Sequence, residues 1–164
     1  MDKKNNTLPL KYQGYTIALQ EVPDEISLAF NISGCPHKCP ECHSKYLWNY
    51  EGNYIGEDLS KVLSKYKEYI SCVCFMGGDQ NLNELYLLCK QIKDNHLKVC
   101  IYSGLNNTDT FIDFINDSLI DYLKIGPYIG EYGGLNNPNT NQRMYKVVNN
   151  NLIDITSIFQ KLKM

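Results

Sequence analysis

The chain of 164 residues is 43% hydrophobic and 21% charged, with a formal net charge of −2. This length suits a single domain, residues 1–164, in which residues 1–12 form a loose N-terminal tail. The small net charge predicts neither nucleic acid nor an anionic membrane as a partner. No apolar run approaches the roughly 18–20 residues of a membrane-spanning helix, so we expect a cytoplasmic protein.

Hydrophobic periodicity predicts strands and helices that alternate along most of the chain. The expected strands are 15–22, 26–33, 70–76, 97–102, 122–125 and 144–148, and the expected helices are 57–66, 82–92, 108–115 and 155–159. Repeated strand–loop–helix order is typical of parallel sheets with right-handed crossovers. The repeats are too few for a closed barrel of about 250 residues. We therefore expect an α/β fold, a partial and open βα barrel with mainly parallel strands.

The seven cysteines fall into two groups. Four lie in apolar segments and are expected to be small buried hydrophobic residues: Cys72, Cys74, Cys89 and Cys100. The other three, Cys35, Cys39 and Cys42, follow the strand 26–33 with the spacing Cys-x3-Cys-x2-Cys. An odd number of cysteines in a chain of this kind argues against a disulfide framework and for a reducing compartment.

The spacing of Cys35, Cys39 and Cys42 suits one loop wrapped around a metal centre. Zinc usually takes four protein ligands, whereas an iron–sulfur cube can be held by three thiolates with one iron left open. In the zinc interpretation the fourth ligand is His37, His43 or a cysteine of the Cys72/Cys74 pair. The position of the loop at a strand end, where α/β active sites gather, favours a reactive centre.

A second loop of interest, Gly77-Gly78-Asp79, follows the buried strand 70–76. Two glycines let a backbone approach a ligand closely, and a carboxylate can accept hydrogen bonds from an ammonium group. A simple turn is the alternative for this tripeptide. Its place one βα unit after the cysteine loop, at the same end of the sheet, favours a shared site.

These motifs resemble those of the radical S-adenosylmethionine enzymes, and within them the activating proteins of anaerobic (class III) ribonucleotide reductases. The resemblance runs from about residue 21 to 159. Its carriers are the segments 32–44, 74–79, 126–129 and 140–143.

The resemblance implies that Cys35, Cys39 and Cys42 bind a 4Fe-4S cluster whose open iron chelates S-adenosylmethionine. It also implies that Gly77, Gly78 and Asp79 hold the amino group of that cofactor. The implied activity is reductive cleavage of S-adenosylmethionine and formation of a glycyl radical. The implied partners are the large subunit of the reductase and an external low-potential electron donor.

Three further residues are candidates for cofactor contacts. Ser103, at the next strand end, is placed to reach the ribose or the carboxylate, with a helix cap as the alternative. His43 offers a flat surface for the adenine. Arg143 is the only arginine of the chain, and a lone guanidinium suggests bidentate pairing with a carboxylate or phosphate. We expect Arg143, with Asn141 and Gln142, to contact either the methionine carboxylate or the reductase.

Some positions depart from the pattern of these enzymes. Glu41 stands where glycine or an apolar residue is common, and Gln80 stands where proline usually follows Gly-Gly-Asp. Two alternative functions remain. One is another small radical S-adenosylmethionine enzyme, either a different glycyl-radical activase or a deazapurine synthase. The other is a non-enzymatic zinc or iron–sulfur module.

Overall fold

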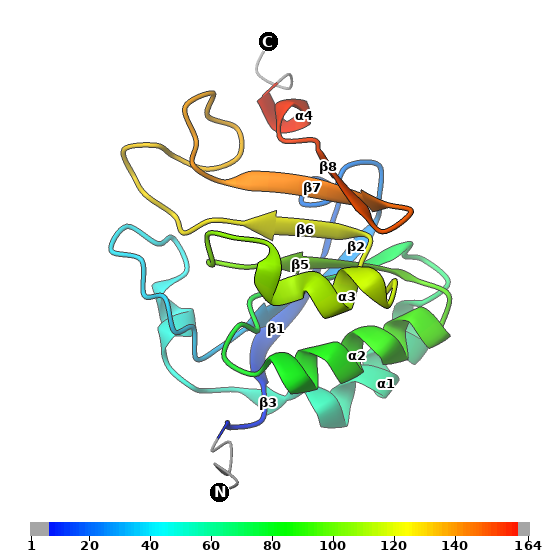
Figure 1. Ribbon diagram of the computed structural model, residues 1–164. Coiled ribbons are helices and arrows are strands. Elements are labelled where there is room, and N and C mark those ends of the chain that lie inside the picture. The colour runs from blue at the N-terminus through cyan, green and yellow to red at the C-terminus, as the bar shows by residue number, and fades with distance from the viewer. Residues whose placement is uncertain (1–6, 161–164) are drawn as a thin grey trace, which may run out of the picture.

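A single mixed β-sheet dominates the computed structural model, which describes residues 7–160 (Figure 1). The strands are β1 (Lys11–Ala18), β2 (Ser27–Ile32), β3 (Asn53–Tyr54), β4 (Cys72–Met76), β5 (Lys98–Tyr102), β6 (Tyr122–Ile125), β7 (Arg143–Val148) and β8 (Asn151–Asp154). Their order in the sheet is β3-β1-β2-β4-β5-β6-β7-β8. The four central strands, β2, β4, β5 and β6, run parallel, and the outer strands pair antiparallel. The description of this sheet as a partial barrel stays a prediction.

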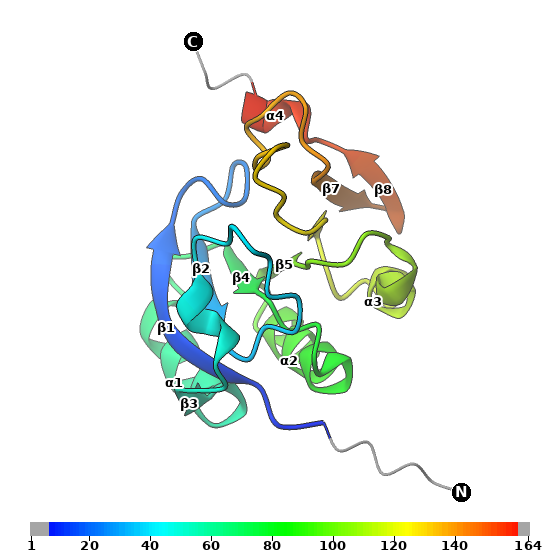
Figure 2. The same ribbon diagram turned by 90° about the vertical axis from the view of Figure 1, so that its left-hand side faces the viewer.

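The longer helices lie in the connections between the parallel strands. The helical elements are η1 (Lys45–Trp48), α1 (Ile55–Tyr66), α2 (Leu82–Asp94), η2 (Asp109–Phe111), α3 (Ile112–Asn116) and α4 (Ser157–Gln160). Figures 1 and 2 show α1, α2 and α3 on one face of the sheet. The side chain of Asn81 caps α2 by accepting a hydrogen bond from the Glu84 N–H group. Within residues 7–160, no helix combines the length and apolarity needed to cross a membrane.

Both faces of the central sheet are buried, which explains why β4 is a continuous apolar run. Val73 and Phe75 point to the helix-covered face, where they join the main core. Cys72 and Cys74 point to the opposite face and pack in a second cluster with Cys100. All four cysteines expected to be buried are buried, and Cys89 lies on the core-facing side of α2. Burial raises the pKa of the Cys72 and Cys89 thiols well above the usual value.

Two features of the termini differ from the sequence-based expectation. The tail predicted for residues 1–12 is too long, because β1 begins at Lys11 and Leu10 is fully buried. Residues 1–6 lie outside the described residues. The hairpin partner β8 was not predicted. Its two-residue turn, Asn149-Asn150, has φ values of +51° and +61°, which asparagine tolerates better than most residues.

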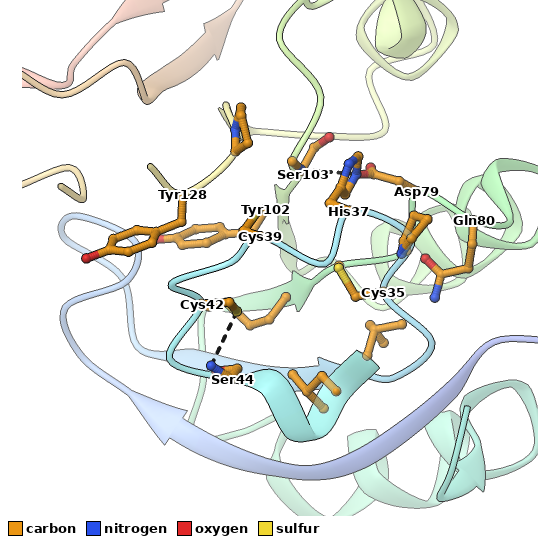
Figure 3. Close-up of a pocket in the computed structure, with 18 of the residues that line it drawn as sticks. Cys35, His37, Cys39, Cys42, Ser44, Asp79, Gln80, Tyr102, Ser103 and Tyr128 are labelled. Carbon is orange, nitrogen blue, oxygen red and sulfur yellow. Dashed lines mark hydrogen bonds and ion pairs between the residues drawn. The ribbon is translucent and has the colours of Figure 1, made fainter. Parts of the chain in front are cut away.

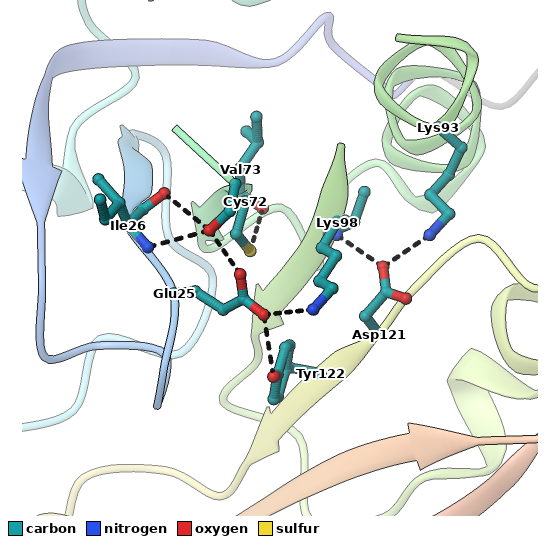
Figure 4. Close-up of polar contacts among 10 residues, drawn as sticks. Glu25, Ile26, Cys72, Val73, Lys93, Lys98, Asp121 and Tyr122 are labelled. Carbon is teal, nitrogen blue, oxygen red and sulfur yellow. Dashed lines mark hydrogen bonds and ion pairs between the residues drawn. The ribbon is translucent and has the colours of Figure 1, made fainter. Parts of the chain in front are cut away.

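A polar network joins the amino ends of the parallel strands (Figure 4). The Glu25 carboxylate, just before β2, accepts hydrogen bonds from Lys98 Nζ (2.6 Å), Ser71 Oγ (2.5 Å) and Tyr122 OH (3.3 Å). The carboxylate is 5% exposed. Burial raises the pKa of Glu25, but the bonds from Lys98 and Ser71 outweigh burial and leave the pKa below its usual value. One carboxylate therefore ties the starts of four strands together.

Replacing this carboxylate tests the network. A lowered pKa in the folded state means that the network stabilises the fold above the unfolded-state pKa and is lost as the pH falls. We expect Glu25→Gln to lower the free energy of unfolding by about 1–3 kcal/mol at neutral pH and to flatten its acid dependence below about pH 5. Denaturant unfolding of the apoprotein at several pH values measures both effects. Glu68→Gln, at an exposed position, is the control, and equal behaviour of the two variants would contradict the role of Glu25.

Candidate metal centre

A cavity of about 200 Å³ lies at the carboxyl ends of the parallel strands (Figure 3). Loops after each of β2, β4, β5 and β6 contribute to its walls, because parallel strands bring their carboxyl ends to the same edge of a sheet. Its walls include Cys35, His37, Cys39, Cys42, Gly77, Gly78, Asp79, Gln80, Tyr102, Ser103, Gly104, Lys124, Gly126, Pro127, Tyr128 and Gln142. The cysteine loop and the Gly-Gly-Asp loop, predicted to share a site, thus line one cavity.

Backbone hydrogen bonds close the base of the cysteine loop. The Gly34 and Cys35 N–H groups donate to the Asn49 and Leu47 carbonyls, at 3.1 and 3.0 Å. Gly34 begins the loop with a φ of +73°, a value that favours glycine. Buried Leu47 anchors the returning chain. The segment that carries the thiols is therefore presented from a fixed base.

The three loop thiols differ in environment from the other four. Cys35, Cys39 and Cys42 are half-buried and line the cavity. The Ser44 N–H group donates to Cys42 Sγ at 3.3 Å. Among residues 7–160, no three His, Cys, Asp or Glu side chains are gathered closely enough to hold a single metal ion. Three soft thiolates spaced around a cavity fit an iron–sulfur cluster, which is larger than one ion.

The Gly-Gly-Asp loop places a buried carboxylate in this cavity. Gly77 and Gly78 both have a φ of +118°, and an added Cβ would lie 3.2 Å from Ile32 and 3.1 Å from Leu85. The Asp79 side chain is 5% exposed. Its Oδ2 accepts hydrogen bonds from the Gly104 N–H group (3.0 Å) and from His37 Nε2 (2.5 Å). Its Oδ1 is buried and has no hydrogen-bond partner within the described part of the chain.

The two departures at positions 41 and 80 have structural explanations. Gln80 Nε2 donates to the Ser33 carbonyl at 2.7 Å, so this side chain ties the Gly-Gly-Asp loop to the base of the cysteine loop. The Glu41 carboxylate lies against Gly130, so close that a Cβ at position 130 would require the Glu41 side chain to move. Glu41 therefore brings the cysteine loop into contact with the loop after β6.

Of the three other residues predicted to contact the cofactor, only Ser103 lines the cavity. Ser103 lines the cavity, and its Oγ accepts a hydrogen bond from the Leu105 N–H group at 3.0 Å, so it caps a turn and not a helix. His43 is exposed and packs edge-on against Tyr128, with ring centroids 5.2 Å apart. Arg143 is 44% exposed and faces Asp154 at 3.7 Å. Neither His43 nor Arg143 is among the described residues that line the cavity.

The neighbours of Arg143 do contact the cavity wall. Asn141 Nδ2 donates to the Pro127 carbonyl (3.0 Å), and Gln142 Nε2 donates to the Gly126 carbonyl (3.3 Å). Gln142 also packs close to Gly126, whose φ is +108°. The Asn-Gln-Arg segment thus supports the loop after β6 through its amides, while the guanidinium points elsewhere.

Lys124 is a cavity residue that the sequence analysis missed. It lies on β6, and its Nζ donates to the Gly126 carbonyl at 3.3 Å. Burial lowers the pKa of Lys124 to about 8, although Cys39 and Asp79 act in the opposite direction. The available signal was a lone charged residue within the otherwise apolar strand Tyr122-Leu123-Lys124-Ile125.

Comparison with known families identifies the metal centre. A model described as a 4Fe-4S single cluster domain matches residues 26–153. Since the match covers most of the chain, this protein belongs to that family. The matched region contains the three loop cysteines and all four parallel strands, and it confirms the predicted 4Fe-4S cluster. Searches of curated proteins and of solved structures gave no significant match.

The assignment of the cluster ligands is testable by substitution. We expect Cys35→Ala, Cys39→Ala and Cys42→Ala each to lose most of the iron and sulfide that the wild-type chain retains after anaerobic reconstitution, about four of each. Iron and sulfide analysis with the visible absorption spectrum measures this loss. Cys89→Ala, at a buried position on α2, is the matched control and should retain the cluster. Full iron content in any of the three loop variants would contradict the assignment.

Proposed function

We propose that this protein is a radical S-adenosylmethionine activase that forms the glycyl radical of an anaerobic ribonucleotide reductase. One observation carries the proposal. The three loop cysteines line the same cavity as Asp79, whose Oδ1 is buried and has no hydrogen-bond partner within the described residues. A buried carboxylate oxygen without a hydrogen-bond partner costs free energy, and a cationic ligand that donates to it would remove that cost. The ammonium group of S-adenosylmethionine is such a ligand.

In this proposal Cys35, Cys39 and Cys42 would hold three irons and leave the fourth for the amino and carboxylate groups of S-adenosylmethionine. When bound and reduced, the cluster supplies the electron that cleaves the sulfonium C–S bond, giving methionine and a 5′-deoxyadenosyl radical. The contribution of the chain is to orient the cofactor and to exclude water around it. Asp79 Oδ1 accepts from the ammonium group, and Gly77 and Gly78 allow the close approach of the backbone.

Lys124 complements the carboxylate end of the cofactor. Lys124 is a half-buried residue of the cavity wall, and Cys39, Cys42 and Asp79 favour its charged form. An added carboxylate would favour the charged form further. Lys124 therefore takes the role that the sequence analysis considered for Arg143. A contact between Arg143 and the partner protein stays a prediction.

The cavity also offers groups for the adenosine part. Tyr128 lies in the cavity wall formed by the loop after β6. In this proposal its ring, and not that of His43, provides the aromatic surface for the adenine. Buried Ser103 lies on the neighbouring loop, and in this proposal its hydroxyl contacts the ribose.

The substrate in this proposal is a glycine Cα–H bond of the reductase large subunit, and the electron comes from an external low-potential donor. Two features support a protein substrate. The segments 126–129 and 140–143, by which the chain resembles the activases, lie together through the bonds of Asn141 and Gln142. They form a wall of the cavity itself, where an entering loop of the partner would meet them.

Anaerobic reconstitution followed by reduction tests the class of enzyme. We expect the reduced holoprotein to convert S-adenosylmethionine to methionine and 5′-deoxyadenosine, and the Cys39→Ala variant to form neither. Mixing with the reductase large subunit should then give a glycyl-radical signal in electron paramagnetic resonance. A colourless protein that binds one zinc would overturn the enzyme proposal. Cleavage of S-adenosylmethionine without formation of a glycyl radical would favour the alternative, another kind of radical S-adenosylmethionine enzyme.

The ammonium site has its own test. Asp79→Asn removes a charged acceptor, so we expect the dissociation constant of S-adenosylmethionine to rise about 10- to 100-fold while the cluster is retained. The measurement is a titration of the reduced holoprotein followed by electron paramagnetic resonance. Asp94→Asn, at the exposed end of α2, is the control. Unchanged affinity in Asp79→Asn would rule out the carboxylate as the ammonium acceptor.

A further inference from the structure

His37 lies between two cluster cysteines, and neither the cluster nor the cofactor contacts described above use it. Its Nε2 is 2.5 Å from Asp79 Oδ2, which makes the closest polar link between the cysteine loop and the Gly-Gly-Asp loop that the structure shows within residues 7–160. The His37 side chain is 22% exposed and the Asp79 side chain 5%. A histidine considered only as a zinc ligand is therefore engaged with the carboxylate of the next loop.

A third loop meets this pair. The Gly104 N–H group donates to the same Asp79 oxygen at 3.0 Å, and the His37 ring lies directly on Gly104. A Cβ at position 104 would be 2.5 Å from His37 Cδ2, closer than real Cβ contacts. The loops after β2, β4 and β5 thus converge on one carboxylate oxygen, and only glycine at position 104 leaves room for the imidazole.

We propose that His37 is a positioning residue that couples the thiol-bearing loop to the ligand-binding carboxylate. It does so by occupying Oδ2 of Asp79, so that Oδ1 is the oxygen left to accept a hydrogen bond from a ligand. The inference rests on the proposed function for the identity of the ligand, but the coupling of the two loops is independent of it.

The physical basis is the rotation of a carboxylate. Two donors on Oδ2 fix the plane of the Asp79 side chain, whereas one donor leaves either oxygen able to serve Gly104. Gln80 already holds the base of the cysteine loop through Ser33. His37 acts further along, between Cys35 and Cys39, where the thiols are carried. Loss of the imidazole should therefore loosen the thiols and the acceptor together, with the base of the loop intact.

Two substitutions break the same contact in different ways. His37→Ala removes the imidazole. Gly104→Ala displaces the imidazole by steric contact and changes no polar group, at a position whose φ lies outside the left-handed region. His37→Gln restores a side-chain N–H donor. His96→Asn, in the exposed turn after α2 where φ is +60°, is the matched control because asparagine tolerates that conformation.

The first measurement uses the apoprotein and needs no cofactor. Alkylation of the loop thiols by iodoacetamide, followed by mass spectrometry, reports how tightly the loop is held. We expect Cys39 to react about tenfold faster in His37→Ala and in Gly104→Ala, and at the wild-type rate in His96→Asn. His37→Gln should recover most of the protection. Circular dichroism of each variant verifies that it is folded, and a wild-type alkylation rate in both His37→Ala and Gly104→Ala would overturn the coupling.

The second measurement uses the reconstituted holoprotein. In the paramagnetic resonance titration, we expect His37→Ala and Gly104→Ala each to raise the dissociation constant of S-adenosylmethionine about tenfold. His37→Gln should restore most of the affinity. The double variant should be no weaker than either single variant, because both act through one contact. Additive effects, or unchanged affinity in both single variants, would overturn the role in presenting Asp79. If the wild-type protein gives no response to S-adenosylmethionine, the proposed function fails, and the alkylation rates still decide whether His37 couples the loops.

Discussion

The parallel arrangement of β2, β4, β5 and β6 is the constraint on which the rest of the structure depends. Parallel strands place all their carboxyl ends at one edge, so four successive loops surround one cavity. The opposite edge is secured by the Glu25 network, which joins the starts of the same strands. The stabilising Glu25 network and the cavity therefore lie at opposite ends of the parallel strands.

Burial separates the two kinds of cysteine. On the strands, Cys72, Cys74 and Cys100 fill space on the face away from the helices, and burial raises the pKa of Cys72 and Cys100. In the loop, Cys35, Cys39 and Cys42 stay half-buried beside a cavity that also holds Lys124. A thiol must ionise to bind iron, so burial makes Cys72 and Cys100 poor ligands for a cluster. The family match agrees with this separation of the cysteines, because a domain with a single cluster needs only one group of ligating cysteines.

Convergence on Asp79 connects the scaffold to the proposed chemistry. Its two oxygens have different surroundings, with His37 and Gly104 on Oδ2 and no partner on Oδ1 within the described chain. Such an asymmetric carboxylate is held in one orientation by the protein, and the proposed function assigns its other oxygen to the ammonium group of the cofactor. The same loop is tied through Gln80 to the base of the cysteine loop. These bonds fix Asp79 relative to the loop that carries Cys35, Cys39 and Cys42.

Local sequence determined the parts of this protein that depend on short spacing. Three cysteines within eight residues define a cluster loop, and apolar runs that end in glycine define the buried strands and the loops that follow them. Contacts between distant loops were decided only by the tertiary structure. Pairing of His37 with Asp79, placement of Lys124 in the cavity and the outward direction of Arg143 join or separate residues far apart in the chain. Local periodicity specifies which face of an element is buried, whereas the partner of a loop side chain depends on how several strand ends pack together.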